Sequence, residues 1–389
     1  GPVPLPLAEA LRLAESHPAV RARQAQMAAA EGRSREAASL LFKNPELGLD
    51  RTRRRGATPD GRANEWGVGI AQSIETGGQQ ARRREAASAS LAALRAEIDD
   101  ARRLARADAA LRFNAVLAAQ RRVLIEQRSV ALFDGTSQAI AKRRAAGEDT
   151  RLDANVALIE VERARNALAV SRERLRDARV ELASALSLPP SSVPGVVGDL
   201  AMPEDDGLPY GPDQLLASAQ ALPKLRALSA QEQAARARVG VEQGNRNPDV
   251  TIGLRVGRDG PASGRESVTT LSLSVPLPLF QRNDAAIGQA LSDVQQAEIE
   301  RTSTTRDVLA QIRQFWFRLD SQRQRLQRLR QAMVAAALDN QQLAEKSRQA
   351  GQIGLLDQLL VNRQALDAER DLNEALAEFH MTRIELENA

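Results

Sequence analysis

The sequence predicts a mainly helical protein with a small β part, and three observations support this prediction. Much of the 389-residue chain is rich in Ala, Arg, Gln and Leu, a bias that favours long helices. The stretch 79–145 contains no proline, and a helix of that length would span about 100 Å at about 1.5 Å per residue. Four short segments interrupt this composition with alternating apolar and polar residues, which is typical of strands.

The composition also excludes several classes of protein. Aromatic residues make up only 3% of the chain, so a conventional globular core would be hard to build. The net charge is +4, and arginines are interleaved with Glu and Asp, which is typical of solvated helix faces and argues against a nucleic-acid partner. The absence of cysteine excludes disulfides and thiolate metal sites. No apolar run reaches the roughly 18 residues of a transmembrane helix.

The two halves of the chain repeat each other. "HPAVRARQ" from His17 is echoed by "LPKLRALS" from Leu222, and the motif pairs are separated by about 204 residues. "NPELGL" is likewise echoed by "NPDVTIGL", and "AGEDTRLD" by "AGQIGLLD". We therefore predict a tandem duplication with repeats at 1–195 and 213–389. The Pro- and Gly-rich segment 188–212 would link the two repeats.

Each repeat is expected to contain a helix, two strands, a very long helix and a further helix. The elements expected in the first repeat are a helix at 8–41 interrupted near Pro18, strands at about 45–54 and 65–74, and helices at 79–145 and 150–187. Those expected in the second are a helix, strands at about 248–257 and 267–277, and helices at 284–349 and 353–387.

The four strands have the length of a tilted strand that crosses a bilayer, roughly ten residues. Each has one apolar and one polar face, although Arg51 and Arg53 continue the apolar face of the first strand. A half-buried sheet in a soluble domain is the alternative. Four strands cannot close a barrel, and an open sheet edge cannot lie in lipid, so the membrane interpretation requires several chains. Three chains would supply twelve strands.

The helices carry narrow apolar stripes that predict a helix-to-helix seam. In the helix at 150–187 large and small residues alternate at heptad spacing, as they do one repeat later. The seam residues are Val161, Ala164, Leu168, Ser171, Leu175, Ala178, Leu182 and Ala185, and then Ala365, Ala368, Leu372, Ala375, Phe379, Thr382 and Leu386. In the long helix the residues at heptad spacing are Leu104, Leu111, Ala118, Ile125, Leu132 and Ala139.

These features together resemble the TolC family of outer-membrane efflux channels. The resemblance is carried by the duplication, the paired strands, the Asn-Pro strand starts and two strand-to-helix turns. One turn is "GIAQSIETGGQQARR", which includes Gly77 and Gly78, and the other is "SVPLPLF", which includes Pro276 and Pro278. The Glu-Thr-Gly-Gly sequence is typical of the heavy-metal branch, the Czc-, Cnr- and Cus-type systems.

The resemblance implies a homotrimer in the outer membrane, with most of its mass in the periplasm. Twelve strands, four per chain, would form a β-barrel in outer-membrane lipid that is continuous with a periplasmic α-helical barrel. The trimer would be a passive duct joined through a periplasmic adaptor to an inner-membrane pump of the resistance–nodulation–division type. Heavy-metal cations are the expected substrate. Gly1-Pro2 resembles a protease-cleavage scar, so we expect that a signal peptide has been removed.

The resemblance also places several residues. "DRTRRRG", from Asp50 to Gly56, would join two strands at the cell exterior, where its arginines would meet lipopolysaccharide phosphate or lie in a solvated loop. The helix turns would form the periplasmic tips that contact the adaptor, and the residues expected there are Gly147, Leu152, Gly351 and Leu355. The tips would also constrict the tunnel, and the residues expected at the constriction are Asp357, Asp153, Leu356 and Leu360.

Three copies of Asp357 would form an anionic ring that attracts cations, and the alternative is an ordinary solvated cap of a helix turn. The sequence departs here from the better-known pattern, because Leu360 lies where a second gate aspartate would be. Arg348 and Ile353 lie where a Tyr and an Arg lock closed tips. A hydrophobic constriction from Leu356 or Leu360 is therefore an equal expectation.

No residue set predicts catalysis, a cofactor or a metal site. The histidines are His17 and His380, too few and too far apart for a triad or a multi-histidine site. We therefore expect a protein that is not an enzyme. The alternative function is a soluble periplasmic adaptor or scaffold built on a coiled-coil hairpin, against which the duplication and the proline-terminated strands argue.

Overall fold

The computed structural model describes residues 4–58, 61–192 and 195–389. The chain divides into two compact units. The helical unit comprises Gly1–Ala22, Asp99–Leu222 and Arg306–Ala389, and the sheet unit comprises Arg23–Ile98 and Pro223–Thr305. Both halves of the sequence contribute segments to each unit. Two long helices, α4 (Gln79–Ala145) and α8 (Asp284–Arg328), each have residues in both units.

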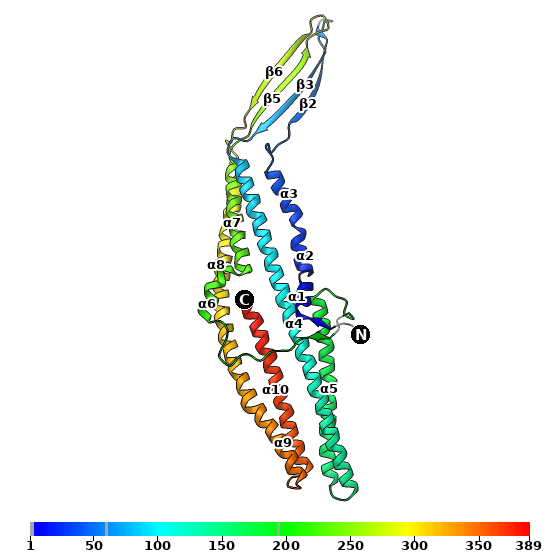
Figure 1. Ribbon diagram of the computed structural model, residues 1–389. Coiled ribbons are helices and arrows are strands. Elements are labelled where there is room, and N and C mark those ends of the chain that lie inside the picture. Colours follow the sequence, from blue (N-terminus) through cyan, green and yellow to red (C-terminus); the bar gives the residue numbers. More distant parts are fainter. Residues whose placement is uncertain (1–3, 59–60, 193–194) are drawn as a thin grey trace. The chain divides into compact units, whose positions relative to one another are not determined.

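The sheet unit contains one antiparallel sheet of four strands in the order β2-β3-β5-β6 (Figure 1). The strands are β2 (Glu46–Arg54), β3 (Ala63–Ile74), β5 (Val250–Asp259) and β6 (Glu266–Ser274). The central pairing joins β3 of the first half of the sequence to β5 of the second, with Val68 opposite Val256. In this sheet the outer strands β2 and β6 each have one neighbour, so each presents an open edge.

One face of this sheet is apolar and exposed. The register aligns Leu47, Ile70, Leu254 and Leu271 in one row across all four strands. Their exposed fractions are 71%, 51%, 47% and 75%, so no part of the chain that the structure describes covers this face. In a soluble domain, other elements would cover the apolar face of such a sheet. An exposed apolar surface of this size therefore indicates contact with lipid or with another chain.

The helices of the sheet unit pack through small side chains. They are α3 (Met27–Ala37), α7 (Pro223–Gly244), the first part of α4, the first part of α8 and the end of α2 (Pro18–Ala25). Ala30, Leu94 and Ile98 form a buried cluster against which Met27 and Leu91 pack. The predicted helix at 8–41 is thus three helices, α1 (Leu7–Ala14), α2 and α3, and Pro18 begins α2 because proline suits the first turn of a helix.

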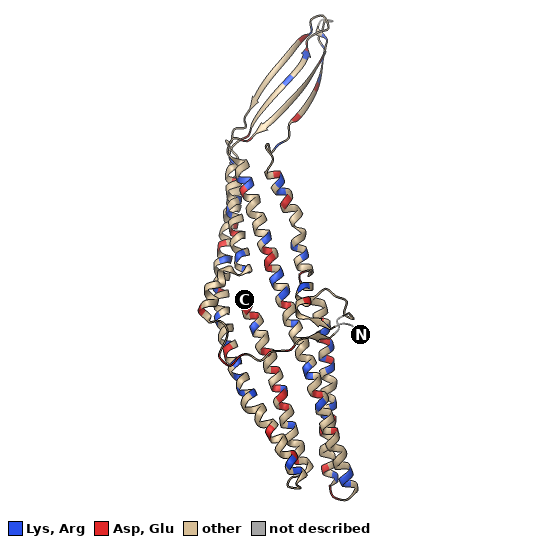
Figure 2. Cartoon of the chain, viewed as in Figure 1, with Lys and Arg blue, Asp and Glu red and all other residues tan. Residues whose placement is uncertain are grey.

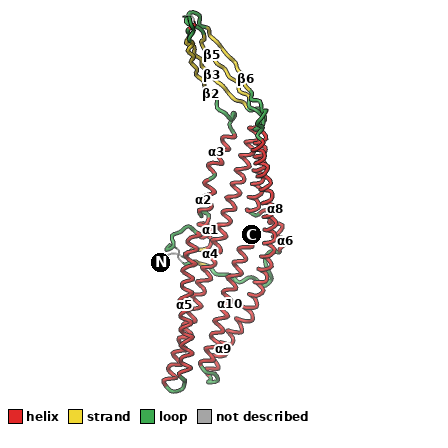
Figure 3. Tube along the Cα trace, turned by 180° about the vertical axis from the view of Figure 1, so that it is seen from behind, coloured by secondary structure: helices red, strands yellow, loops and turns green. Residues whose placement is uncertain are grey.

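The helical unit consists mainly of two hairpins (Figure 3). The first joins α4 to α5 (Arg151–Ala185), and the second joins α9 (Ala335–Gln349) to α10 (Leu355–Glu387). Shorter elements accompany them: β1 (Leu5–Pro6) paired with β4 (Val196–Val197), α1, α6 (Pro212–Ser218) and the 3₁₀ helix η2 (Ala219–Ala221). A buried cluster with members on α4, α5 and α10 holds the hairpins together, including Phe133, Val161 and Leu366.

The predicted helix at 284–349 contains an irregularity that the sequence did not reveal. A π-helical segment, η3 (Leu329–Val334), separates α8 from α9. A π-helical turn contains an extra residue and needs neither proline nor glycine, so it leaves no mark in the composition. Three strands also differ from the expected ranges by two residues or more: β3 begins at Ala63, β5 runs from Val250 to Asp259, and β6 ends at Ser274, before Pro276.

The heptad seams of α5 and α10 are confirmed, since Val161, Ala164 and Leu182 are buried, as are Ala365 and Leu386. The seam predicted for α4 is only partly buried within this chain: Ile125 is buried, and Leu111, Ala118 and Ala139 are half-buried. Leu104 is 54% exposed and Leu132 38% exposed, whereas their neighbours Ala105 and Phe133 are buried. Apolar residues at adjacent heptad positions form two neighbouring stripes on α4. Spacing alone does not decide which of these stripes packs against other helices of the same chain.

Charged residues of both signs are spread along the helices (Figure 2). Among the strands, β2 and β5 carry several charged residues, whereas β3 and β6 carry one each, Glu65 and Glu266. Glu126 on α4 is fully buried and lies between two guanidinium groups: Arg370 Nε donates to its Oε1 at 2.8 Å and Arg122 Nε at 2.7 Å. Burial acts to raise the pKa of Glu126, but the hydrogen bonds from Arg370 and Arg122 outweigh it and the pKa is lowered. None of the described helices has both the length and the apolarity to cross a membrane.

Candidate functional site

The two hairpins of the helical unit end in turns of the same geometry. Gly147 ends the first helix of one hairpin with φ +80° and Gly351 that of the other with φ +75°. The Gly147 N–H donates to the Arg144 carbonyl at 2.9 Å and the Gly351 N–H to the Arg348 carbonyl at 3.0 Å. In both turns the next N–H donates to the carbonyl five residues back, which completes a Schellman motif. Glycine is needed because other residues are strained at positive φ.

Asp153 and Asp357 occupy the same position, three residues into the second helix of each hairpin. The Thr150 N–H donates to Asp153 Oδ2 at 2.9 Å, and the Asp153 N–H donates to Thr150 Oγ1 at 3.2 Å. The hydrogen bond from the Thr150 backbone lowers the pKa of Asp153. The Gly354 N–H donates to Asp357 Oδ2 at 3.4 Å. Gly354 has no hydroxyl, so the second helix cap is the simpler one.

The four leucines expected at the tips lie in different surroundings. Leu355 and Leu356 are partly buried and pack against the cluster that joins the hairpins. Leu360 is 53% exposed and Leu152 is 71% exposed. Asp357 is exposed as well. Because Asp357 and Leu360 are three positions apart on α10, they lie on the same face of the helix.

Glu345 organises the second tip, although no sequence motif points to it. Its carboxylate accepts from Arg348 at 2.8 Å, from Gln349 at 3.0 Å and from Gln358. The hydrogen bond from Arg348 does most to lower the pKa of Glu345. The bond to Gln358 connects α9 to α10. Glu345 and Gln358 are 13 residues apart and belong to no recognisable motif, so spacing does not reveal the pair.

The first strand-to-helix turn is held by Gln79, whose side chain is almost fully buried. Its Oε1 accepts from the Gly77 N–H at 2.7 Å, and its Nε2 donates to the Asn247 carbonyl at 3.3 Å. A Cβ on Gly77 would lie 2.2 Å from Asn247 Nδ2, and Gly78 has φ +72°. Both glycines are therefore required for α4 to begin beside the start of β5.

The second strand-to-helix turn contains Pro276 and Pro278, which are exposed. The apolar residues around them are also exposed: Leu277 by 74%, Leu279 by 64% and Phe280 by 93%. The prolines end β6 because their ring nitrogens cannot donate to a sheet ladder. Apolar side chains with this exposure in one chain indicate that another surface covers them.

The second face of the sheet is polar and lined with small residues. Arg255 Nε donates to Asp50 Oδ1 at 2.8 Å, and a second guanidinium nitrogen donates to Oδ2 at 2.5 Å. A Cβ on Gly67 would lie 2.3 Å from the Arg255 guanidinium, and one on Gly257 would lie 3.2 Å from it. Arg255 therefore lies flat across β3 because glycines leave room for it.

In the described residues, no group of three or more His, Cys, Asp or Glu side chains is arranged to hold a metal ion. His380 is buried, and its Nε2 lies 2.6 Å from the Ala201 carbonyl oxygen. Burial lowers the pKa of His380. The geometry is that of a histidine used in helix packing.

Comparisons with known proteins agree with this architecture. The model of the family "Outer membrane efflux protein" matches residues 11–187 and 213–389. The cobalt-zinc-cadmium resistance protein CzcC of Cupriavidus metallidurans is 29% identical over 350 residues, which are 86% of this chain and 76% of CzcC.

Two solved outer-membrane proteins share the fold. The outer-membrane channel OprN superposes with a TM-score of 0.79 at 20% identity, over 98% of this chain and 89% of OprN. CusC superposes with a TM-score of 0.75 at 16% identity, over 98% of this chain and 90% of CusC. The match to a channel family removes the alternative of a soluble adaptor or scaffold. The chain belongs to the outer membrane efflux protein family, and it is a non-enzymatic outer-membrane efflux channel with the TolC-type fold.

Proposed function

We propose that this channel works as a homotrimer that conducts heavy-metal cations passively from a periplasmic adaptor and an inner-membrane pump to the cell exterior. The observation that carries the trimer is the four-stranded sheet with two open edges and one exposed apolar face. Open edges are not tolerated in lipid, so neighbouring copies must pair with β2 and β6. Three copies would supply twelve strands, an even number as in other bacterial barrels.

The cargo is proposed from a relative and from the chemistry of the tips. CzcC is named for resistance to cobalt, zinc and cadmium, and it is similar to this chain over most of its length. A duct needs weak cation attraction, because tight chelation would slow release. We propose that Asp357 and Asp153 provide this attraction as rings of carboxylates around the threefold axis.

The constriction at the tips is proposed to include Asp357, Asp153, Leu356 and Leu360. The exposure of Asp357 and Leu360 on one face of α10 supports a role for these two in particular. Leu356 packs against the cluster between the hairpins, so it would support the constriction from behind.

The adaptor is proposed to contact the turns at Gly147, Leu152, Gly351 and Leu355. Leu152 is the most exposed of the leucines there, and an apolar side chain left exposed at the end of a hairpin suits contact with a protein partner. The pump of the resistance–nodulation–division type would supply the energy for export.

The experiment that tests this proposal is single-channel recording in planar bilayers under a zinc chloride gradient. The wild-type trimer should conduct zinc ions in preference to chloride, and Asp357→Ala should lower the cation-to-anion permeability ratio by at least about twofold, because a carboxylate ring concentrates cations.

The matched control is Asp307→Ala, which removes an exposed carboxylate on α8. It should leave the ratio unchanged. An unchanged ratio in Asp357→Ala would remove this residue from the lining, and a strictly monomeric protein in detergent would overturn the trimer itself.

A further inference from the structure

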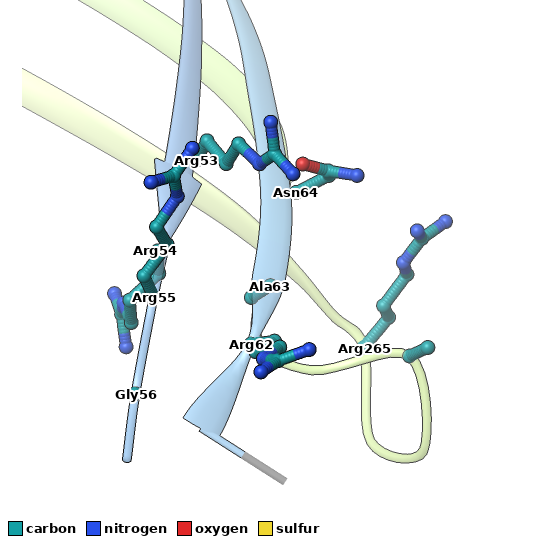
Figure 4. Close-up of a pocket in the computed structure, with 9 residues that line it drawn as sticks. Arg53, Arg54, Arg55, Gly56, Arg62, Ala63, Asn64 and Arg265 are labelled. Carbon is teal, nitrogen blue, oxygen red and sulfur yellow. The ribbon is translucent and has the colours of Figure 1, made fainter. Parts of the chain in front are cut away.

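Five arginines gather where β2 ends, where β3 begins and at the turn between β5 and β6. Arg53, Arg54, Arg55, Arg62 and Arg265 line a hollow of about 550 Å³ together with Gly56, Ala63, Asn64 and Ala262 (Figure 4). Arg53 and Arg54 lie at the end of β2, within the strand predicted at about 45–54, although they also belong to the segment expected to join two strands at the cell exterior. The arginines therefore project from paired strands as well as from loops.

The hollow has a large excess of positive charge. Within the described residues, Arg54 is the only one of the five with an ion pair, 2.9 Å from Glu65. Glu65 is buried and also accepts from the Gly260 N–H at 3.1 Å, so this pair belongs to the framework of the sheet. The loop sequence contributes Asp60, whose single carboxylate cannot neutralise the other four guanidinium groups.

Two glycines hold the arginine-bearing segments close together. A Cβ on Gly56 would lie 2.6 Å from the Gly61 Cα, and a Cβ on Gly61 would lie 2.9 Å from the Gly56 Cα. The two backbones therefore touch at a point where no side chain fits. This contact continues the pairing of Arg54 with Ala63 and holds the backbone at Arg55 close to the backbone at Arg62.

The hollow also lies at the end of the exposed apolar face. Along β2 the residues on this face change from Leu47 and Leu49 to Arg51 and Arg53. In the sheet register, Arg51 of β2 lies opposite Trp66 of β3, which in turn lies opposite Arg258 of β5. An apolar band followed by tryptophan and arginine is the order of side chains found where a membrane protein leaves hydrocarbon for the headgroup layer.

We propose that this hollow binds the phosphate groups of a lipid in the outer leaflet, a phosphorylated glycolipid such as lipopolysaccharide. The guanidinium group presents a planar fork of donors that matches phosphate in a bidentate manner, and several forks around one hollow suit a multiply phosphorylated headgroup. The inference rests on the proposed function in one respect, namely that the apolar face of the sheet lies in lipid.

The test uses the full chain in detergent micelles and measures its affinity for bis-phosphorylated lipid A and for dephosphorylated lipid A. Wild type should prefer the phosphorylated lipid. The variant Arg53→Gln/Arg55→Gln/Arg62→Gln should bind it at least about tenfold more weakly, since each lost charge-assisted bond is a substantial part of the affinity. Arg54 is kept because it pairs with Glu65.

Two further variants make the result specific. The variant Arg53→Lys/Arg55→Lys/Arg62→Lys keeps the positive charges but loses the bidentate guanidinium donors. Its affinity for phosphorylated lipid A should therefore lie between that of wild type and that of the triple glutamine variant. Arg172→Gln/Arg174→Gln/Arg176→Gln removes the same charge from exposed positions of α5 and should match wild type. Retention of oligomeric state and of the thermal unfolding midpoint shows that a variant is folded.

Equal affinity of wild type and the first glutamine variant would overturn the proposal, and so would equal affinity for both lipids. Displacement of the lipid by inorganic phosphate at similar concentration would show a site for free phosphate and overturn the assignment to lipid. Conductance separates this proposal from the proposed function. A wild type that binds lipid A but forms no conducting trimer contradicts only the function, and a conducting trimer without phosphate preference contradicts only the lipid site.

Discussion

Arg255 is the residue that best shows how the polar face of the sheet is built. Its guanidinium lies over Gly67 and Gly257 and reaches Asp50 on β2, two strands away. Asp50 and Arg255 are 205 residues apart, and Asp50 belongs both to the strand predicted at about 45–54 and to the segment expected to join strands at the cell exterior. The pair became visible only when the register of three strands was known, because pairing across strands depends on tertiary contacts.

The role of the glycine is tested by Gly67→Ala. The new methyl group would displace the Arg255 guanidinium and break its ion pair with Asp50. Gly48→Ala is the control, because its Cβ would meet only a carbonyl at 3.9 Å. The free energy of unfolding of Gly67→Ala should be lower than that of Gly48→Ala by up to about 1 kcal/mol, the range for a solvent-accessible ion pair.

The measurement is denaturant-induced unfolding from lipid vesicles. In an Arg255→Met background the difference between the two alanine variants should disappear. A difference that persists there would show that Gly67→Ala acts on the backbone and not on the ion pair.

At the scale of elements, the hairpins of the helical unit depend on small apolar side chains and one buried ionic group. Glu126 on α4 accepts two hydrogen bonds from Arg370 on α10, at 2.8 Å and 2.7 Å, and a third from Arg122. A buried carboxylate is tolerated only with such partners. This group therefore fixes the pairing of two helices that lie far apart in the sequence.

Arg370→Met should lower the free energy of unfolding by about 3–5 kcal/mol, because it leaves a buried charge short of a partner. The double variant Glu126→Gln/Arg370→Met should recover a large part of this loss. The measurement is thermal unfolding of the purified protein, and equal stability of the single and double variants would contradict the explanation.

The pH dependence follows from the lowered pKa of Glu126. Since the folded-state pKa lies below the ordinary 4.5, the ionised group contributes stability above that pH, and this contribution is lost as the pH falls through the folded-state pKa. The difference in the free energy of unfolding between wild type and Arg370→Met should therefore be largest near neutral pH and become smaller on acidification. A difference that increases in acid would contradict this assignment.

The elements differ in how far the sequence predicted them. Heptad spacing identified the seams of α5 and α10, because one stripe of each helix is apolar and the rest polar. On α4 it identified one of two adjacent apolar stripes, and this stripe is only partly buried within the chain: Ile125 is buried and Leu132 is exposed, whereas Phe133 on the other stripe is buried. It also missed the π-helical segment and the contact of Glu345 with Gln358, since neither follows from local spacing. The residues proposed at the constriction and the adaptor surface remain predictions.

At the scale of the whole molecule, the sheet matters because a single chain leaves it incomplete. Its large apolar side chains are exposed and its outer strands lack a second neighbour in the described residues. The class of fold was predictable from sequence because alternation fixes both faces of a strand and the duplication fixes the number of strands.

The assignment of the apolar face to lipid is testable on β6, where adjacent residues point to opposite faces.

Leu271→Arg places a charge on the apolar face, and Thr270→Arg places the same charge on the polar face. Leu271→Arg should lower the free energy of folding into lipid vesicles by about 2–4 kcal/mol, the cost of arginine near the middle of a bilayer. Thr270→Arg should cost much less. The measurement is the fraction of protein folded into vesicles against denaturant concentration, and equal losses for both variants would show that neither face lies in lipid.

The unequal caps at Thr150 and Gly354 have a mechanical consequence. The first hairpin begins its returning helix with reciprocal bonds, whereas the second has a single longer bond of 3.4 Å and no hydroxyl. We expect the second hairpin to fray at lower force. A trimer would have six hairpin tips, in which the more stable tips at Thr150 alternate with the less stable tips at Gly354. Opening of the tunnel would then begin at the three tips at Gly354 and not at all six.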